Sequence, residues 1–300
     1  MKRVFVIGAS GYIGKAVVKH LRQQQIEVAA LSRTAEKEPP LIELGARVVR
    51  GDTEALEILA REASAADAVI YTAVNNPNEH SALKALIASL EDSGKPLLFT
   101  SGATIVAEAT EGRYSTRQVG EDEDVTPPPG SVRLSSEKIV REAAARGIRS
   151  MVIRPPLVYG NAGSTQIPRY YNCGRKTGTV RYVGPGENCW AFVHVDDLAE
   201  MYSRLLTDGQ RGHVYHAVAG EVLMGDLARA VARVLDVPAD GWSVPEAEQW
   251  YGTWAAQVGL GGNCRPVGRV AEAHLHWRPG RTDILEDVIS GSYARAWHTD

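Results

Sequence analysis

The chain has 300 residues, of which 44% are hydrophobic and 23% charged, and its formal net charge is −3. This length suits one large α/β domain with or without a smaller lobe, and the charge gives no basis for binding nucleic acid or an anionic membrane. No run approaches the roughly 20 apolar residues that span a bilayer. The three cysteines, Cys173, Cys189 and Cys264, lack metal-ligand spacing, so we expect a cytoplasmic protein without a disulfide framework or a metal site.

The first third of the chain alternates short β-branched runs with helical patterns. The pattern predicts strands at 4–7, 27–32, 47–50, 68–72 and 96–100, and helices at 12–22, 54–63 and 79–90. Such alternation is typical of a parallel sheet with crossover helices. The strands are apolar on both faces, as a sheet covered by helices on both sides requires.

Beyond the fifth strand, residues 101–130 read as a long polar loop, and loops of that length in compact domains usually serve function. Ser131 is expected to cap a helix through residue 146. A strand at 149–154, a glycine-rich irregular stretch, and helices at 196–206, 224–235 and 284–296 follow. We therefore expect a doubly wound α/β fold, with one domain at 1–160 to which 190–220 returns, and a smaller C-terminal lobe at 161–189 and 221–300.

A glycine-rich loop joins the first strand to the first helix. It reads Gly8-Ala-Ser-Gly-Tyr-Ile-Gly14, and its glycines would let the backbone approach a pyrophosphate at the helix N-terminus. The alternative is a tight turn without a ligand. We expect a Rossmann-type dinucleotide site here, with contacts from Gly8, Ser10, Gly11, Tyr12, Ile13 and Gly14.

The end of the second strand indicates which dinucleotide is bound. An acidic residue there would bind the ribose 2′-hydroxyl of NAD, whereas an arginine accommodates the 2′-phosphate of NADP. This chain has Ser32, Arg33 and Thr34 and no carboxylate. The sequence therefore favours NADP(H), unless Arg33 is an ordinary solvated arginine. We extend the cofactor site to the end of the fourth strand, at Thr72, Ala73 and Val74.

Five motifs in this order resemble the extended short-chain dehydrogenase/reductases, which include the NAD-dependent epimerases and dehydratases. They are the glycine loop, Gly51-Asp52, Arg154-Pro-Pro-Leu-Val-Tyr-Gly160, Phe192-Val-His-Val-Asp-Asp-Leu-Ala199 and Leu275-His-Trp-Arg-Pro279. The resemblance implies that Asp52 binds the adenine amino group, although Asp52 or Thr53 could simply cap the next helix. It also implies that Pro155, Leu157 and Val158 border the nicotinamide.

The resemblance places Tyr159 near the substrate pocket, with a packed aromatic at the domain junction as the alternative. We expect Asp196 or Asp197 to cap the following helix, with His194 buried near the cleft floor rather than binding a metal.

The chain departs from the family at the catalytic groups, which makes it an atypical member. The family uses a Ser/Thr together with Tyr-x-x-x-Lys on one helix, where the lysine lowers the tyrosine pKa and holds the nicotinamide ribose. Our alignment puts Leu134 at the tyrosine and retains Lys138 for catalysis and cofactor binding. It puts Gly102 at the Ser/Thr, so the flanking Ser101 and Thr104 become candidates.

Three functions fit this mismatch. We favour an NADPH-dependent reductase of a small molecule with a relocated proton donor, for which Tyr159, Tyr114, His194 and water are candidates. The alternatives are an epimerase, isomerase or dehydratase-like enzyme that retains the dinucleotide, and a non-catalytic NADP(H)-binding sensor. The substrate would be a small molecule held by segments 160–190 and 240–265, and the chain could form a homodimer, as family members often do.

Overall fold

The central element of the computed structural model, which describes residues 1–129 and 133–297, is a parallel sheet. Within those residues it has seven strands in the order β11-β7-β5-β4-β1-β2-β3. Their bounds are Arg3–Ile7 (β1), Glu27–Ser32 (β2), Arg47–Arg50 (β3), Ala68–Tyr71 (β4), Pro96–Thr100 (β5), Arg149–Arg154 (β7) and Val214–His216 (β11). The order runs outward from β1 in both directions, so the predicted doubly wound Rossmann-type fold is confirmed.

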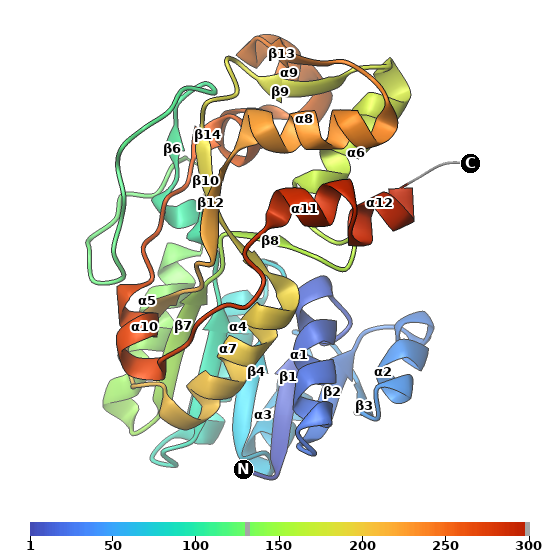
Figure 1. Ribbon diagram of the computed structural model, residues 1–300. Helices are drawn as coiled ribbons and strands as arrows, with labels where there is room; N and C mark the ends of the chain where they lie inside the picture. The colour runs from blue at the N-terminus through green and yellow to red at the C-terminus, as the bar shows by residue number, and fades with distance from the viewer. Residues whose placement is uncertain (130–132, 298–300) are drawn as a thin grey trace.

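Helices cover both faces of this sheet (Figure 1). Val4 and Val6 of β1 point into a core closed by α1 (Tyr12–Gln23) and α7 (Val195–Asp208). Phe5 and Ile7 alternate to the opposite core, closed by α3 (Leu56–Ala65), α4 (Glu79–Leu90) and α5 (Leu134–Glu142). The helix α10 (Arg269–Leu275) packs beside β11, and the short α2 (Pro39–Glu43) precedes β3. The period-two alternation of a buried strand thus gives each helical layer its own apolar partner.

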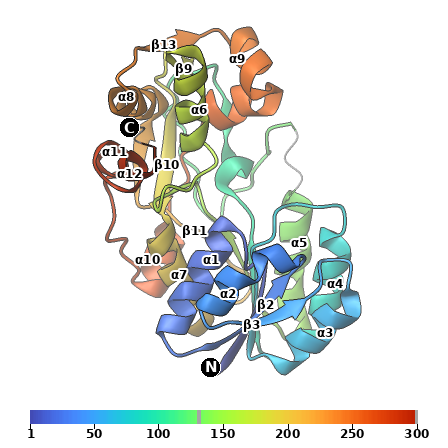
Figure 2. The same ribbon diagram turned by 90° about the vertical axis from the view of Figure 1, so that its right-hand side faces the viewer.

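A smaller lobe lies over the carboxyl ends of the strands (Figures 1 and 2). Its sheets pair β8 (Leu157–Tyr159) with β10 (Cys189–His194) and β12 (Gly220–Leu223), β9 (Val180–Val183) with β13 (Ala239–Trp242), and β6 (Glu108–Ala109) with β14 (Gly262–Asn263). Its helices are α6 (Ile167–Thr177), α8 (Met224–Leu235), α9 (Val244–Tyr251), α11 (Ile284–Ile289) and α12 (Ser292–Trp297). One apolar cluster joins these elements. The predicted domain boundaries stay a prediction.

Several elements differ from the sequence-based expectation. The stretch after residue 160, expected to be irregular, contains α6, because Gly174 packs against Leu235 and Val180 at the helix interface instead of breaking the helix. The helix expected at 284–296 is split into α11 and α12 around Gly291. The loop at 101–130 includes a 3-10 turn at Ala103–Val106 and the strand β6. The predicted cap Ser131 lies outside the described residues.

Within residues 1–129 and 133–297, no helix combines the length and apolarity needed to cross a bilayer. In the same part of the chain, no three His, Cys, Asp or Glu side chains gather in a way that could hold a metal ion.

Candidate functional site

A pocket of about 390 Å³ opens at the carboxyl ends of β1, β2 and β4. Of the residues predicted to bind a cofactor, those that line it are Gly8, Ser10, Gly11, Arg33, Asp52, Thr53, Thr72, Ala73 and Val74. Open α/β sheets bind ligands in this crevice, at the point where the strand order reverses. The structure therefore gathers residues from four separate loops into one concave site.

The glycine loop forms one wall of the pocket. Gly8 has a φ of +83°, and a Cβ on it would lie 2.5 Å from the backbone nitrogen of Ala73. A Cβ on Gly14 would lie 2.1 Å from the Gly8 carbonyl oxygen, so only glycine allows this close approach of helix and strand. No side chain caps α1 at Gly11. The first-turn N–H groups and the positive end of the helix dipole are therefore available to an anion.

The opposite end of the pocket carries two cations. Arg33 follows β2, and Lys37, which the sequence analysis missed, follows on a 3-10 turn at Ala35–Lys37. Ser32 is buried, and its hydroxyl donates to the Thr34 carbonyl oxygen at 3.1 Å. Ser32 and Thr34 are absent from the pocket lining, so their predicted contact with the cofactor finds no support in this arrangement.

Hydrogen bonds join the two loops on the far side of the pocket. The Thr53 hydroxyl donates to Asn76 Oδ1 at 3.0 Å, and Asn78 Nδ2 donates to Glu54 Oε1 at 2.8 Å. Asp52 Oδ1 accepts from the backbone N–H of Glu54 at 2.9 Å. Asp52 thus closes a turn, and α3 starts later, at Leu56, without a side-chain cap. Glu54, Asn76 and Asn78 also line the pocket and were not predicted.

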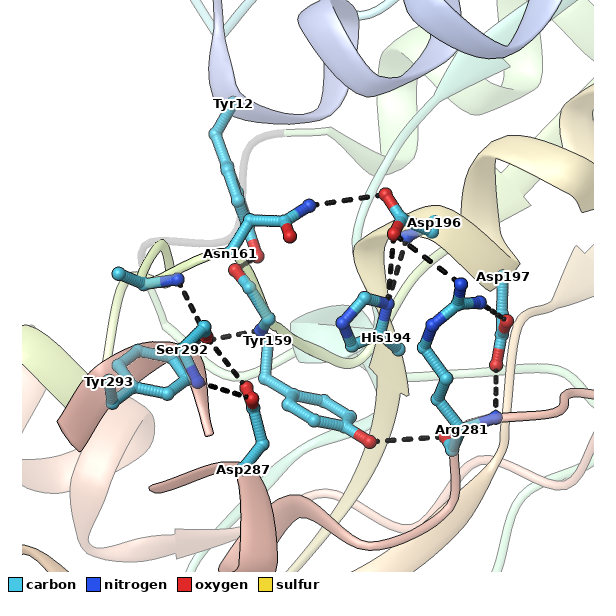
Figure 3. A network of polar contacts seen from close by, with 12 residues as sticks. Tyr12, Tyr159, Asn161, His194, Asp196, Asp197, Arg281, Asp287, Ser292 and Tyr293 are labelled. Carbon is cyan, nitrogen blue, oxygen red and sulfur yellow. Dashed lines mark hydrogen bonds and ion pairs between the residues drawn. The ribbon is translucent and has the colours of Figure 1, made fainter. Parts of the chain in front are cut away.

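Tyr12 does not line the pocket, and Figure 3 shows its side chain pointing toward the segment that follows Tyr159. Its hydroxyl donates to the Gly160 carbonyl oxygen at 2.6 Å, and burial raises the pKa of the phenol far above its usual range. Ile13 packs against the apolar core beneath α1. The side chains of these two residues connect the glycine loop to its surroundings, and the predicted cofactor contacts of Tyr12 and Ile13 stay a prediction.

Lys138 lies on the outer side of α5. Its side chain is 76% exposed, and its Nζ lies 3.9 Å from Glu142 Oε1. The prediction that it binds the cofactor and takes part in catalysis is contradicted by this position. A one-residue shift along a helix turns a side chain by about 100°, and the inward-facing residues here lie one position earlier.

Arg133 is the N-cap of α5, and Glu137 lies four residues later. These two residues face inward, and Leu134 and Lys138 do not. Arg133 Nη2 donates to the Ala73 carbonyl oxygen at 2.5 Å and to Glu79 Oε2 at 2.9 Å, while Nη1 donates to the Thr100 carbonyl oxygen. Glu137 accepts from Arg154 at 2.6 Å. Both positions of the family's Tyr-x-x-x-Lys spacing are therefore occupied by residues with internal ionic partners.

The hydroxyls at the end of β5 keep their candidate roles. Ser101 Oγ is buried and has no hydrogen-bond partner among the described residues. Thr104 Oγ1 lies 3.7 Å from the place that a Cβ on Gly102 would occupy. Because Gly102 aligns with the family's Ser/Thr, the Thr104 hydroxyl lies within one side-chain length of that position. The proposed roles of Ser101 and Thr104 stay predictions.

Tyr159 is a packed aromatic at the junction of the sheet and the lobe (Figure 3). Its hydroxyl donates to the Arg281 carbonyl oxygen at 3.1 Å, and its ring lies edge-on to His194, with 5.1 Å between centroids. Burial raises its pKa, which makes the phenol a poor proton donor. The alternative named for Tyr159 is therefore supported over a catalytic role. In the same segment, Leu157 and Val158 lie in β8, beside the pairing strand β10.

His194 caps α7, where the sequence predicted Asp196 or Asp197. Its Nδ1 accepts from the Asp196 backbone N–H at 3.1 Å, and burial lowers the pKa of the ring, which keeps this acceptor unprotonated. The Asp197 carboxylate accepts from the Arg281 backbone at 2.7 Å and from its guanidinium at 2.6 Å. These contacts fasten the segment before α11 to α7 (Figure 3).

Comparison with known proteins places this arrangement in a family. The model of the NAD dependent epimerase/dehydratase family matches residues 4–218. The chain belongs to this family. The match confirms the resemblance to extended short-chain dehydrogenase/reductases that the five motifs indicated.

Among curated relatives, this epimerase/dehydratase-family chain is 31% identical to the protein YLL056C of Saccharomyces cerevisiae over 299 residues, covering 95% of this chain and 97% of the yeast protein. It is 26% identical over 332 residues to "Oxidase ucsJ" of an Acremonium species, covering 96% of this chain and 95% of the oxidase.

Solved structures share the fold. MoeE5 in complex with UDP-glucuronic acid and NAD has a TM-score of 0.76 and 21% identity, covering 98% of this chain and 99% of that one. The dTDP-glucose 4,6-dehydratase of Bacillus anthracis in complex with NAD has a TM-score of 0.78 and 14% identity, covering 99% of this chain and 98% of that one. Arg133, the N-cap of α5, and Glu137 within α5 both face inward and distinguish this chain from the family's usual catalytic pattern.

Proposed function

We propose that this family member is an NADP(H)-dependent oxidoreductase that reduces a carbonyl or related group of a small molecule. One observation carries the proposal. A single pocket has a glycine loop and a helix N-terminus at one end, and Arg33 with Lys37 at the other. A pyrophosphate fits the first end, and a 2′-phosphate fits a pair of cations at the second.

The pocket's residues suit the cofactor. Gly8 and Gly14 allow the close backbone packing that shapes the glycine loop, and Val74 presents an exposed apolar side chain to the site. Asp52 would accept a hydrogen bond from the adenine amino group while it keeps its bond to the Glu54 backbone N–H. When bound, the cofactor supplies a hydride to the substrate. Pro155, Leu157 and Val158 would border the reacting ring, and Ser101 or Thr104 would hydrogen-bond the substrate oxygen, with water as the proton source.

Relatives support reduction as the chemistry. The chain is 25% identical over 233 residues to a ketoreductase of a farnesyl dihydroquinoline oxide from Stigmatella aurantiaca. It is 24% identical over 211 residues to 2-alkyl-3-oxoalkanoate reductase of Stenotrophomonas maltophilia. The similar solved structures hold NAD, which supports a nicotinamide dinucleotide, whereas the preference for NADP(H) rests on Arg33 and Lys37 of this chain.

The test is a comparison of cofactor affinities. We expect the wild-type protein to bind NADPH more tightly than NADH. Arg33→Ala should weaken NADPH by at least roughly tenfold, the scale of hydrogen bonds to a charged group, and leave NADH nearly unchanged. Lys37→Ala should act in the same direction. Titration calorimetry measures all of these constants. Arg61→Ala, on α3 outside the pocket, is the matched control and should change neither cofactor's affinity.

Two outcomes would reject this assignment: a wild-type preference for NADH, or equal losses for both cofactors in Arg33→Ala. Either would mean that Arg33 does not meet the 2′-phosphate.

A second candidate, a protein that binds NADP(H) without turning it over, is favoured by α5. Its inward positions hold Arg133 and Glu137, and Tyr159 and His194 are engaged in structural contacts. Incubation with NADPH and a panel of ketones and quinones separates the two functions. The reductase oxidises NADPH with at least one of them, whereas a sensor binds NADPH tightly and consumes none. An epimerase or dehydratase would convert its substrate without net change in the cofactor.

A further inference from the structure

Arg133 joins two strand ends at the edge of the cofactor pocket. Its guanidinium donates to the carbonyl oxygen of Ala73, after β4, and to that of Thr100, the last residue of β5. Ala73 lines the pocket, and the residue after Thr100 is Ser101, whose hydroxyl is buried without a partner among the described residues. The guanidinium therefore lies between the pocket and the predicted place of the substrate oxygen.

Glu79 and Phe99 fix the orientation of the Arg133 guanidinium. Glu79 Oε2 accepts from Nη2 at 2.9 Å, and Glu79 Oε1 accepts from the Ser136 hydroxyl at 2.7 Å. The guanidinium carbon lies 5.3 Å from the centroid of the Phe99 ring. A planar guanidinium held by a carboxylate and an aromatic ring has little rotational freedom left to lose when it binds a ligand.

A second arginine provides an internal comparison. Arg154 pairs with Glu137, and the two side chains are only 3% and 1% exposed, so this pair is closed to any ligand. Arg133 pairs with Glu79, which is 2% exposed, yet its own side chain remains 16% exposed. Arg133 thus combines a buried counter-ion with a face that a ligand can reach.

A bound dinucleotide would bring its second half to this place. In doubly wound folds the two nucleotide halves lie on either side of the point where the strand order reverses. Here the adenosine half belongs with Arg33 beside β2, and the nicotinamide half belongs over β4 and β5. Lys138, which the sequence alignment assigned to that half, faces solvent.

We propose that Arg133 binds the nicotinamide-side ribose of the cofactor and thereby takes over the cofactor-holding role that the family assigns to the lysine. This inference rests on the proposed function. Nη1 already donates to the carbonyl oxygens of Thr100 and Ser101, and Nη2 donates to Ala73 and Glu79. A ribose hydroxyl would therefore accept a charge-assisted hydrogen bond from the remaining Nε–H. An arginine stays charged at any physiological pH, so it can hold the ribose but cannot serve as the proton donor.

Two ligands test the proposal by binding alone. NADPH contains both nucleotide halves, whereas 2′,5′-ADP contains only the adenosine half with its 2′-phosphate. We expect Arg133→Met to weaken NADPH by at least about tenfold and to leave 2′,5′-ADP within about twofold of wild type. Lys138→Met, on α5 and five residues after Arg133, is the control and should bind both ligands as wild type does.

The removal of Arg133 leaves the buried Glu79 without its cation, so Arg133→Met could fail to fold. The double variant Arg133→Met with Glu79→Gln removes that charge, and Arg133→Lys keeps one. We expect the double variant to reproduce the selective loss of NADPH and the lysine variant to recover part of it. Circular dichroism checks that each variant is folded.

The outcomes separate this inference from the proposed function. Unchanged NADPH affinity in a folded Arg133 variant overturns the inference alone, and equal losses for NADPH and 2′,5′-ADP overturn it in favour of a purely structural role. A wild-type protein that binds neither ligand rejects the proposed function and this inference together.

Discussion

His216, at the end of β11, uses both ring nitrogens in its neutral form. Nδ1 lies 3.2 Å from the Val267 carbonyl oxygen, and Nε2 lies 3.4 Å from Arg154 Nη1. A carbonyl accepts and a guanidinium donates, so the neutral ring carries its proton on Nδ1. Burial, reinforced by the Arg154 charge, lowers the pKa of His216 to about 3. A proton on Nε2 would face a cation in a buried place.

This histidine predicts a loss of stability in mild acid. An unfolded histidine titrates near pH 6.5, so between pH 6.5 and about 3 the unfolded chain binds a proton that the folded chain excludes. The free energy of unfolding should therefore decrease as the pH is lowered through this window. This group contributes at most about 1.4 kcal/mol per pH unit. Urea unfolding between pH 7 and 4.5 measures the slope.

His216→Asn should make the free energy of unfolding depend less steeply on pH. The quantity to compare is the difference in slope between this variant and the wild type. Glu121, whose carboxylate accepts from the His216 backbone N–H, has a pKa raised by burial and contributes with the opposite sign above pH 4.5. The absolute slope of the wild type therefore mixes several groups. An unchanged slope in the variant would mean that His216 does not exclude its proton.

The side chains on α5 show why a site can be predicted only in part from its sequence. The helix and a basic residue near the family position were both predictable. Its rotation was not, because it depends on Glu79, 54 residues before Arg133, and on Arg154, 17 residues after Glu137. Buried ion pairs of this kind combine residues whose types alone suggest an exposed surface.

At the scale of elements, Gly11 at the N-cap of α1 and Gly14 within α1 meet different structural demands. A Cβ on Gly14 would meet the Gly8 oxygen at 2.1 Å, whereas a Cβ on Gly11 would meet the same oxygen at 3.2 Å. The first contact is impossible without movement of the backbone, and the second needs a shift of a few tenths of an ångström. Of these two residues, Gly14 is the one that the fold itself requires to be glycine.

This difference predicts contrasting variants. Gly14→Ala should lower the melting temperature markedly, because helix and strand must separate. Gly11→Ala should remain folded and lose NADPH affinity, because its methyl group would enter the space of the pyrophosphate. Thermal unfolding and NADPH titration of both proteins check the pair. A folded Gly11→Ala with wild-type NADPH affinity would contradict the assignment of the loop.

Six strands of the large sheet were predicted, at 4–7, 27–32, 47–50, 68–72, 96–100 and 149–154, and the structure has a strand at each of these places. The edge strand β11 was missed because Val214, Tyr215 and His216 form a run of only three residues. Such a strand is specified by its neighbour β7 rather than by its own pattern.

At the scale of the whole molecule, the C-terminal helices complete the junction between sheet and lobe. Tyr293, on α12, is buried, and its hydroxyl accepts from the Gly160 backbone N–H at 3.0 Å and donates to the Gly163 carbonyl oxygen. Ser292 Oγ accepts from the Ala162 N–H at 2.9 Å and donates to Asp287. Figure 3 shows these residues around the segment that follows Tyr159.

Removal of this one hydroxyl should destabilise the protein. Tyr293→Phe leaves the Gly160 N–H and the Gly163 carbonyl without their partner, and a buried unsatisfied group costs about 1–3 kcal/mol. We expect a loss of that size in the free energy of unfolding by urea. Tyr114→Phe, at an exposed tyrosine, is the control and should change it by less than about 0.5 kcal/mol. Equal stability of the two variants would contradict the role given to Tyr293.

The contact between Tyr293 and Gly160 spans 133 residues of the chain, which has a consequence for biosynthesis. At roughly 5–20 residues per second, a ribosome needs on the order of 10 s to make the intervening segment. During that time the large sheet can form, but the segment beside the proposed nicotinamide site has no α12 to close it. The pocket beside Arg33 can therefore form on a nascent chain well before the proposed nicotinamide site is closed.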